Sequence, residues 1–175
     1  MKARITAWLR TLAASIAARL IGISDRRPPD FVIGSAQDPY LLRWWLLPRN
    51  PVLNVYLHCF LRSDDDRALH DHPWANLSVL LRGKYLEHTI DAGGIHHRRQ
   101  LAAGNVRLRA LGTMAHRVEL HEGACWTLFI TGPRYREWGF HCPDEGWIHW
   151  ERFTAEDDPG AIGRGCAAGP GKGDA

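Results

Sequence analysis

The sequence predicts an all-β domain built as a sandwich or barrel of short strands. Short runs of aromatic and β-branched residues recur along the chain. Turn residues separate these runs about every ten residues, which is the spacing expected of an all-β sandwich or barrel. Apolar and charged residues alternate over 105–111, as in a strand with one buried face. No internal repeat and no glycine-rich phosphate loop accompanies these strands.

The composition is that of one globular domain. The chain has 175 residues, of which 45% are hydrophobic and 23% charged, enough to bury a core without disulfides or metal. The net charge of +3 is too small to indicate a nucleic-acid partner. We expect a helix and linker over 1–30, a β-barrel over 31–153 and a flexible tail over 154–175, which is rich in glycine, alanine and acidic residues.

The first segment carries apolar residues at helical spacing, interrupted by arginines. The apolar positions are Ile5, Trp8, Leu9, Leu12, Ile16 and Leu20. We expect a basic amphipathic helix that packs on the domain. A helix that contacts a membrane surface or a partner is the alternative, and a cleaved signal peptide is a third. The apolar stretch between Arg10 and Arg19 is too short to span a bilayer.

The elements follow in order. Residues 24–40, with two adjacent prolines, are expected to form a loop, and the prolines at 48 and 51 precede a strand over 52–62. An acidic turn, Asp64 to Asp66, leads into a short strand with His70 and His72. Further strands are expected over 75–83, 84–91, 95–101, 104–111, 112–120, 125–132, 135–142 and 147–153; two glycines supply the hairpin turn between the second and third of these.

Two histidines one residue apart provide the first functional signal. Residues i and i+2 of a strand point to the same face, so His70 and His72 project together and Asp71 projects away. Two such imidazoles can bind one metal ion. His116, whose expected strand face includes Val118, is the candidate third ligand. Histidines in a metal-free pocket are the alternative.

These residues resemble the two-part signature of the cupin superfamily. His70, His72, Asn76 and Gly83 match the spacing of its first motif, and Gly104, Ala110, Gly112 and His116 resemble the second with one extra residue before the histidine. The resemblance covers about residues 53–130. It implies a small cupin jelly-roll barrel that holds a divalent metal in its mouth, with Fe(II) the leading candidate and Mn, Ni or Zn as alternatives. Small cupin-like proteins of bacterial and phage genomes share similar stretches.

The chain departs from the family pattern where the pattern expects a glutamate ligand. Asn76 stands there, and a neutral amide is a poor substitute for a carboxylate at a divalent ion. The resemblance therefore implies a centre of three histidines, as in thiol-dioxygenase-like cupins. Asn76 is the candidate catalytic residue, orienting water, oxygen or substrate. Asp64, Ala110 and Leu120 replace the leading glycine, the proline and the closing asparagine of the two motifs.

Four further residues are candidates for substrate binding. Trp74 follows the histidine strand and is expected to wall the barrel mouth. Arg82, counted in twos from Asn76, is an anion-clamp candidate, although surface salt pairing is the alternative. Glu87 shares a face with Tyr85 and is a candidate for the missing carboxylate.

The neighbouring charges and thiols are expected to have ordinary roles. We expect Arg107 and Arg109 to lie on a solvated face, with Val106 and Leu108 turned inward. The acidic run at 64–66 is expected to be solvated, or to order a ligand histidine. The four cysteines form no C-x-x-C pair and are expected to be free thiols in a cytoplasmic protein.

Two classes of function remain open. The leading hypothesis is a mononuclear iron oxygenase or dioxygenase acting on a small polar molecule, and a cupin isomerase or hydrolase would use the same site. The alternative is a non-catalytic barrel that binds a metabolite or a metal as a sensor or accessory protein. The expected partners are a small-molecule substrate and a second copy in a homodimer, with no nucleic acid and no membrane-spanning segment.

Overall fold

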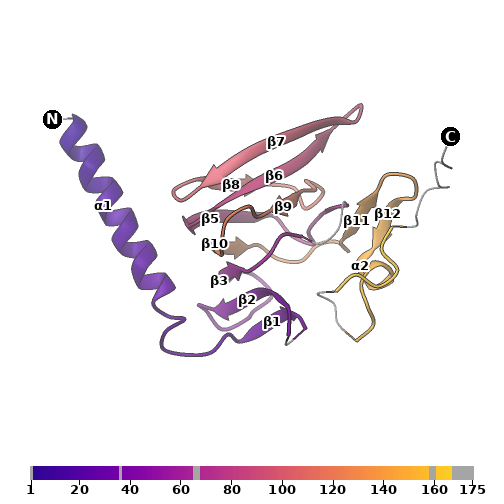
Figure 1. Ribbon diagram of the computed structural model, residues 1–175, viewed down its shortest axis with the longest axis horizontal. Helices are drawn as coiled ribbons and strands as arrows, with labels where there is room; N and C mark the ends of the chain where they lie inside the picture. Colours follow the sequence, from indigo (N-terminus) through magenta and orange to yellow (C-terminus); the bar gives the residue numbers. More distant parts are fainter. Residues whose placement is uncertain (1, 36, 65–67, 158–160, 167–175) are drawn as a thin grey trace.

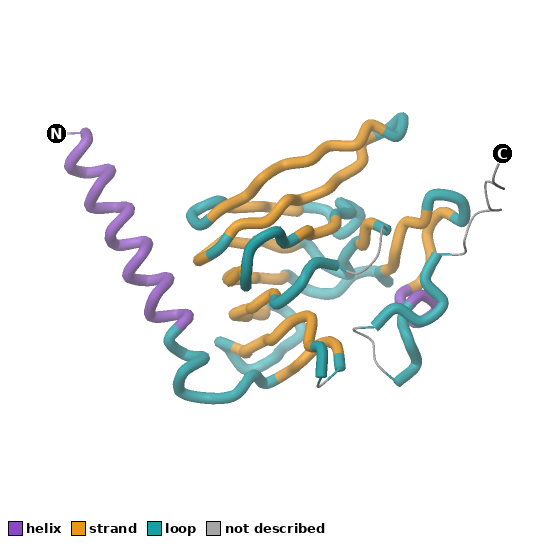
Figure 2. Tube along the Cα trace, viewed as in Figure 1, coloured by secondary structure: helices purple, strands orange, loops and turns teal. Residues whose placement is uncertain are grey.

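The computed structural model of the chain describes residues 2–35, 37–64, 68–157 and 161–166 (Figure 1). The helices are α1 (Lys2–Ile21) and α2 (Trp150–Phe153). The strands are β1 (Phe31–Gly34), β2 (Pro39–Trp45), β3 (Asn54–Phe60), β4 (Leu69–His70), β5 (Asn76–Arg82), β6 (Lys84–Asp91), β7 (Ile95–Ala102), β8 (Val106–Arg109), β9 (Arg117–Glu119), β10 (Cys125–Thr131), β11 (Gly139–Cys142) and β12 (Gly146–His149). Strands dominate the chain (Figure 2), as the all-β prediction requires.

The strands form one large sheet and two small ones, and every strand pair is antiparallel. The large sheet has the order β1-β2-β3-β10-β5-β8. The small sheets have the orders β7-β6-β9 and β12-β11-β4. An isolated bridge between His70 and His116 joins the two small sheets where β4 meets the start of β9. Side chains of all three sheets line one cavity.

This arrangement confirms the predicted jelly-roll barrel with an N-terminal helix. Strands distant in sequence, β3, β10 and β5, are hydrogen-bonded neighbours, which is the crossing pattern of a jelly roll rather than of a simple meander. The predicted hairpin is β6 paired with β7. Its turn contains Gly93 and Gly94, both at positive φ, where other residues are rarely accommodated.

One strand lies in the segment expected to be a loop. β1 occupies Phe31–Gly34 and pairs with β2 at the edge of the large sheet. Phe31 and Val32 are exposed, so this short run lacks the buried alternation that identifies a strand in a sequence. The prediction of a loop over the whole of 24–40 was therefore wrong.

Helix α1 projects away from the barrel and contacts it through its C-terminal end (Figure 1). Leu20 and Ile21 pack on a cluster centred on Trp44 and Trp126, whereas Trp8, Leu12 and Ile16 are exposed. The expected packing on the domain is thus seen at the C-terminal end of the helix, where Ala17 is also buried, and not at the exposed Trp8, Leu12 and Ile16. Among the described residues, no helix combines the length and apolarity needed to cross a bilayer.

The segment expected to be a flexible tail is instead attached to the barrel as far as Cys166. Cys166 forms a disulfide with Cys142 on β11. The backbone N–H groups of Gly163 and Gly165 both donate to the carbonyl of Phe153. Composition predicted a tail because this segment has few apolar residues of its own, but backbone hydrogen bonds and a covalent bond hold it. The residues at 158–160 and 167–175 lie outside the described part of the chain.

The prediction of four free thiols was correspondingly wrong for Cys142 and Cys166. Cys59 and Cys125 are free and buried. Burial raises the pKa of Cys59 to about 11 and that of Cys125 to about 12. These two thiols behave as small apolar groups within the sheet.

Candidate metal centre

Three histidines meet where the two small sheets join. The backbone N–H of His70 donates to the carbonyl of His116, and the N–H of His116 donates back, each at 2.9 Å. His70 and His116 are therefore a directly opposed antiparallel pair, whose side chains share a face. His72, two residues beyond His70, follows the alternation and reaches the same place.

The ring positions match a mononuclear site. The ring centroids are 4.7 Å apart for His70 and His116, 5.2 Å for His70 and His72, and 5.2 Å for His72 and His116. The three candidate ligand nitrogens lie within 4.8 Å of one another. The Nε2 atoms of His72 and His116 are 3.0 Å apart, the separation of two ligands at right angles and about 2.1 Å from one ion.

All three rings are held in the form that binds metal. Burial lowers the pKa of His70. It lowers the pKa values of His72 and His116 well below the usual range, and nearby positive groups act in the same direction on both. Neutral imidazole is the protonation state required of a ligand. The donor set and its electrostatics therefore fit a divalent metal ion.

A buried ion pair supports His116 from behind. Glu87 on β6 forms ion pairs with Arg109 and with Arg107, the latter at 2.7 Å. The Nδ1 atom of His116 lies 3.5 Å from the Glu87 Oε1 atom and 3.0 Å from Arg109 Nη2. Because a guanidinium only donates, His116 Nδ1 is the acceptor in its contact with Arg109. Glu87 therefore acts on the ring through Arg109, which it holds in place by an ion pair.

The inward position of Arg109 overturns the predicted orientation of β8. Asn76 and Ser78 on β5 are inward and buried, and they oppose Arg109 and Arg107 directly. The arginines therefore face the interior, while Val106 and Leu108 are 55% and 62% exposed. Hydrophobic alternation predicted that Val106 and Leu108 face the interior and that the arginines face solvent. This prediction was wrong because Glu87 lies in the interior and neutralises the charge of Arg107 and Arg109.

Asn76 lies beside this ion pair. It is buried, and its Oδ1 atom accepts a hydrogen bond of 3.3 Å from Arg109 Nη1. Its Nδ2 atom is buried and has no hydrogen-bond partner among the described residues. Asn76 is not among the residues that line the cavity, and its predicted catalytic role stays a prediction.

Asp71 anchors the histidine strand on the side away from the metal. It is fully buried, and it accepts hydrogen bonds from the Gly139 N–H at 2.8 Å and the Trp147 indole at 3.1 Å. Arg136 adds an ion pair at 2.9 Å. Burial alone would raise the pKa of Asp71, but hydrogen bonds from His141, Gly139 and Arg136 bring it below the ordinary value. This anchoring fixes the strand between the two ligands it carries.

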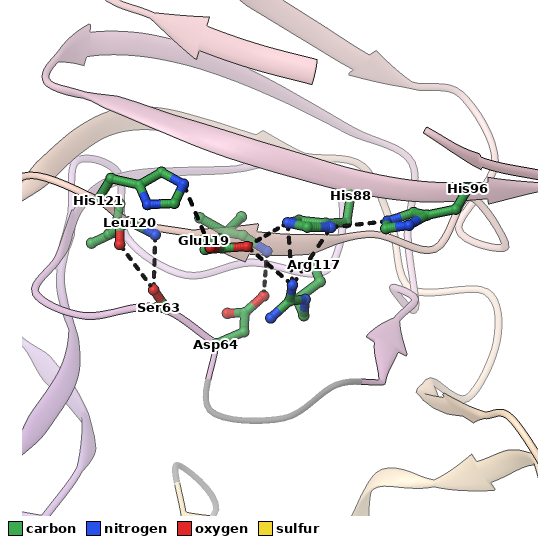
Figure 3. Close-up of polar contacts among 9 residues, drawn as sticks. Ser63, Asp64, His88, His96, Arg117, Glu119, Leu120 and His121 are labelled. Carbon is green, nitrogen blue, oxygen red and sulfur yellow. Dashed lines mark hydrogen bonds and ion pairs between the residues drawn. The ribbon is translucent and has the colours of Figure 1, made fainter. Parts of the chain in front are cut away.

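The loop before the histidine strand is tied to the strand that follows His116 (Figure 3). The Asp64 N–H donates to the Val118 carbonyl, and the Asp64 carboxylate accepts the Val118 N–H at 2.6 Å. The same carboxylate accepts from the Tyr40 hydroxyl and lies 3.6 Å from His70 Nδ1. Asp64 is thus placed to orient a candidate ligand, the second of the two roles considered for the acidic run; Asp65 and Asp66 lie outside the described residues.

A second group of histidines lies nearby but has a different character (Figure 3). His88 contacts Glu119 at 2.7 Å, His96 at 2.9 Å and Arg117 at 3.1 Å. His88 follows the inward Glu87 and so points to the opposite face of β6. Throughout the described chain, His70, His72 and His116 form the one group with three ligand atoms close enough for a metal ion.

Gly112 explains one feature of the second sequence motif. Its carbonyl accepts the His72 N–H at 2.9 Å. A Cβ atom at this position would lie 2.2 Å from the His72 carbonyl oxygen. This clash is with the backbone, so a change of side-chain rotamer could not remove it. A glycine is therefore required for the loop before His116 to pass beside the histidine strand.

The triad forms part of the wall of a cavity of about 530 Å³. The wall is largely aromatic; among its members are Tyr40, Tyr56, Phe60, Phe129 and Phe140. Trp74 and Tyr85, two of the four predicted substrate-binding residues, also line it, whereas Arg82 and Glu87 do not. A buried aromatic cavity beside a metal site suits a small molecule with an apolar body.

Arg82 lies on the outer surface because of a bulge in β5. The pairing of β5 with β10 shifts register between Trp126 and Thr127, so Leu80 opposes Thr127 and Arg82 opposes Trp126. The extra residue reverses the alternation. Arg82 is exposed, and its guanidinium carbon is 5.3 Å from the ring centroid of Trp126. The anion-clamp prediction for Arg82 assumed an unbroken alternation and was wrong.

Two residues that the sequence analysis did not select also line the cavity. His58 on β3 is buried and opposes Arg43 on β2. Arg43 Nε donates to His58 Nε2 at 2.9 Å. An available signal was the arginine itself, which interrupts the otherwise apolar stretch from Leu41 to Leu47; a charge within such a run indicates an internal polar site.

The fold and the histidine triad are consistent with the cupin resemblance of the sequence. A scan against protein-family models found no match, and no curated protein matched the sequence. Two solved structures show a distant likeness. Fe(II) HppE has 15% sequence identity, with 61% of this chain and 57% of that chain covered and a TM-score of 0.49. Oxalate oxidase in complex with the substrate analogue glycolate has 14% identity, with coverages of 62% and 59% and a TM-score of 0.46. An uncharacterised double-stranded β-helix protein from Klebsiella pneumoniae has 14% identity, with coverages of 63% and 90% and a TM-score of 0.46.

The likeness to these structures is partial. The matched part spans 56% and 57% of the length of the HppE chains. At such identities and TM-scores, the reactions of these proteins carry no information about the reaction of this one. The functional proposal below rests on the triad and its cavity.

Proposed function

We propose that the protein is a metal-dependent enzyme that holds one divalent ion through His70, His72 and His116 and acts on a small molecule in the adjoining cavity. The observation that carries the proposal is the meeting of three neutral imidazoles at the wall of a cavity of about 530 Å³. A purely structural metal site has four closed ligands. Three ligands leave coordination positions that face the cavity.

Fe(II) is the proposed metal and dioxygenation the proposed reaction class. Imidazole ligands suit iron, and three neutral ligands leave the full positive charge of the ion to attract a substrate. When bound, Fe(II) supplies a redox-active centre with positions open to substrate and oxygen. Both atoms of O₂ are transferred to the substrate, which supplies the four electrons, so the reaction needs no external reductant.

The chain supplies position and an apolar surrounding. Glu87 holds Arg109, whose guanidinium donates to His116 Nδ1 and so keeps Nε2 turned toward the ion. The largely aromatic wall gives the reacting groups an apolar surrounding.

Oxygen consumption tests this function. The full chain is reconstituted anaerobically with Fe(II), and O₂ uptake is measured over a panel of small carboxylates, thiols and amino acids. His72→Ala is the loss-of-function variant, and His96→Ala, which changes a histidine outside the cavity, is its matched control. Uptake in wild type and His96→Ala but not in His72→Ala is the expected result. Iron bound without uptake on any compound would favour the non-catalytic binding protein instead.

A further inference from the structure

Arg43 places an uncompensated cation in the cavity wall. It lies on β2, and its guanidinium carbon is 5.0 Å from the ring centroid of Tyr56. Its Nε atom is occupied by His58. Its two terminal Nη groups have no hydrogen-bond partner among the described residues, and Arg43 lines the cavity. These two donors are therefore available to a molecule inside it.

No acidic side chain of the described residues forms an ion pair with Arg43. The other arginine deep in the wall, Arg109, is paired with Glu87. The carboxylate of Asp64, which also lines the cavity, is bound to the Tyr40 hydroxyl and the Val118 N–H. Arg43 is half-buried, and removing a charge even partly from water without a partner is costly. The missing partner of Arg43 is best supplied by a ligand.

His58 holds this cation without neutralising it. Because His58 Nε2 accepts the Arg43 hydrogen bond, its ring proton is on Nδ1. Burial, followed by the charge of Arg43, lowers the pKa of His58 well below the usual range, so the ring stays neutral. The guanidinium is thereby fixed in one orientation, and a fixed planar fork is the geometry that binds a carboxylate with two hydrogen bonds.

The cation and the metal centre belong to one wall. The ring of His58 stacks on Phe129, with centroids 5.0 Å apart. Phe129 in turn contacts His72, with centroids 6.1 Å apart. Tyr56 stacks on Phe129 at 6.5 Å. An aromatic surface thus runs from the cation to the candidate metal ligands.

We propose that the substrate is a carboxylate with an apolar, ring-sized body, that Arg43 binds its carboxylate and that the aromatic surface formed by Tyr56, His58 and Phe129 holds its body. This inference rests on the proposed function, because it names the substrate class of the same site. Arg49, which lines the cavity mouth over Trp45, adds a second positive charge that attracts the anion. His58 is the positioning residue for Arg43.

Calorimetric titration with phenylacetate tests the inference, with neutral phenylacetamide as the uncharged analogue. The full chain is titrated loaded with metal and again after chelation, as wild type, Arg43→Gln and Arg82→Gln. Arg82 is the matched control, because it is an arginine on the outer face. We expect Arg43→Gln to bind phenylacetate about ten- to hundredfold more weakly in both forms, and Arg82→Gln to bind like wild type. Phenylacetamide should bind weakly and be indifferent to Arg43.

Several outcomes would overturn the inference. The inference fails if wild type and Arg43→Gln bind phenylacetate with equal affinity. It also fails if wild type binds phenylacetate and phenylacetamide equally, or if it does not bind phenylacetate at millimolar concentration. Arg43→Lys separates charge from folding: it should recover part of the lost affinity, and no recovery in a variant that unfolds at the wild-type temperature counts against the inference. Failure of wild type to bind metal, with Arg43-dependent phenylacetate binding intact, would remove the proposed function alone.

Discussion

His70 and His116 exchange both backbone hydrogen bonds of an antiparallel pair, each 2.9 Å long. The bridge joins two sheets and sets the positions of two candidate ligands through the backbone, before any side chain contact is made. These backbone hydrogen bonds do not depend on the identity of the side chains at positions 70 and 116. Alanine variants of the ligands should therefore keep the fold, and their loss of metal can be interpreted as loss of a ligand.

The first prediction concerns the buried carboxylate behind His116. In Glu87→Gln, Arg107 and Arg109 face a neutral amide in the interior, so the free energy of unfolding should fall by about 3–5 kcal/mol. Metal affinity should fall about 10- to 100-fold, because Arg109 loses the carboxylate that holds it against the Nδ1 atom of His116. Urea unfolding of the metal-free protein measures the first effect, and competition with a chelator measures the second.

Glu122→Gln is the matched control for this substitution. Glu122 pairs with Lys84, and its side chain is 70% exposed, so its loss should cost about 0–1 kcal/mol and leave metal affinity unchanged. Equal effects of the two substitutions would contradict the supporting role of Glu87.

The predicted site residues that the structure brings together are those fixed by local alternation. His70 and His72 share a face because they are two apart in an extended strand, and His116 was selected from the same rule applied to Val118. Asn76 was correctly placed near the triad by motif spacing. These inferences need only the two-residue period of extended backbone, and His72 and His116 keep it although they lie just outside β4 and β9.

The residues that the sequence misplaced depend on pairing between strands. Arg82 faces outward because one extra residue in β5 shifts its register against β10. Arg109 faces inward because it opposes Asn76 and meets Glu87 there. Arg43 and His58 form a unit only because β2 and β3 are neighbours in register. No local pattern in the sequence contains this information.

The second prediction is a pH dependence of stability that arises from His58. The pKa of His58 is lower in the folded protein than in the unfolded chain, where it is about 6.5. The folded state therefore binds fewer protons below that value, so stability is fully present above about pH 6.5 and is lost as the pH falls toward the folded pKa. The slope due to this one group is up to about 1.4 kcal/mol per pH unit.

His58→Phe isolates that contribution, because phenylalanine retains the stack on Phe129. Urea unfolding of the metal-free protein at a series of pH values should give a smaller loss of stability on acidification in the variant than in wild type. His97→Phe is the control, since the His97 side chain is 51% exposed. A wild-type pH profile in His58→Phe would contradict the assignment.

The third prediction counts thiols. Cys142 and Cys166 are joined, and Cys59 and Cys125 are free. Unfolding the protein without reductant should therefore expose two reactive thiols per chain, whereas the folded protein should react slowly because burial raises the pKa of both. Four reactive thiols in the unfolded, unreduced chain would contradict the attachment of the C-terminal segment through Cys166.

Removing the Cys142–Cys166 disulfide measures its contribution to the free energy of unfolding. Its ends are 24 residues apart, and closing a loop of this length stabilises the folded state by about 3 kcal/mol through the entropy of the unfolded chain. Cys166→Ser should lose an amount of this order in urea unfolding. Cys59→Ser removes one free thiol without opening the disulfide. It is therefore a control for the thiol count and not for the free energy of unfolding.

The most direct test of the account is the metal content of the full chain. Wild-type protein is reconstituted anaerobically with Fe(II), separated from free metal and measured by elemental analysis, beside His70→Ala, His72→Ala and His116→Ala. The account predicts one ion per wild-type chain and a large loss in each of the three variants, with His96→Ala retaining the wild-type value. Wild-type protein that retains no stoichiometric iron, manganese, nickel or zinc, or triad variants that retain the same metal as wild type, would contradict it.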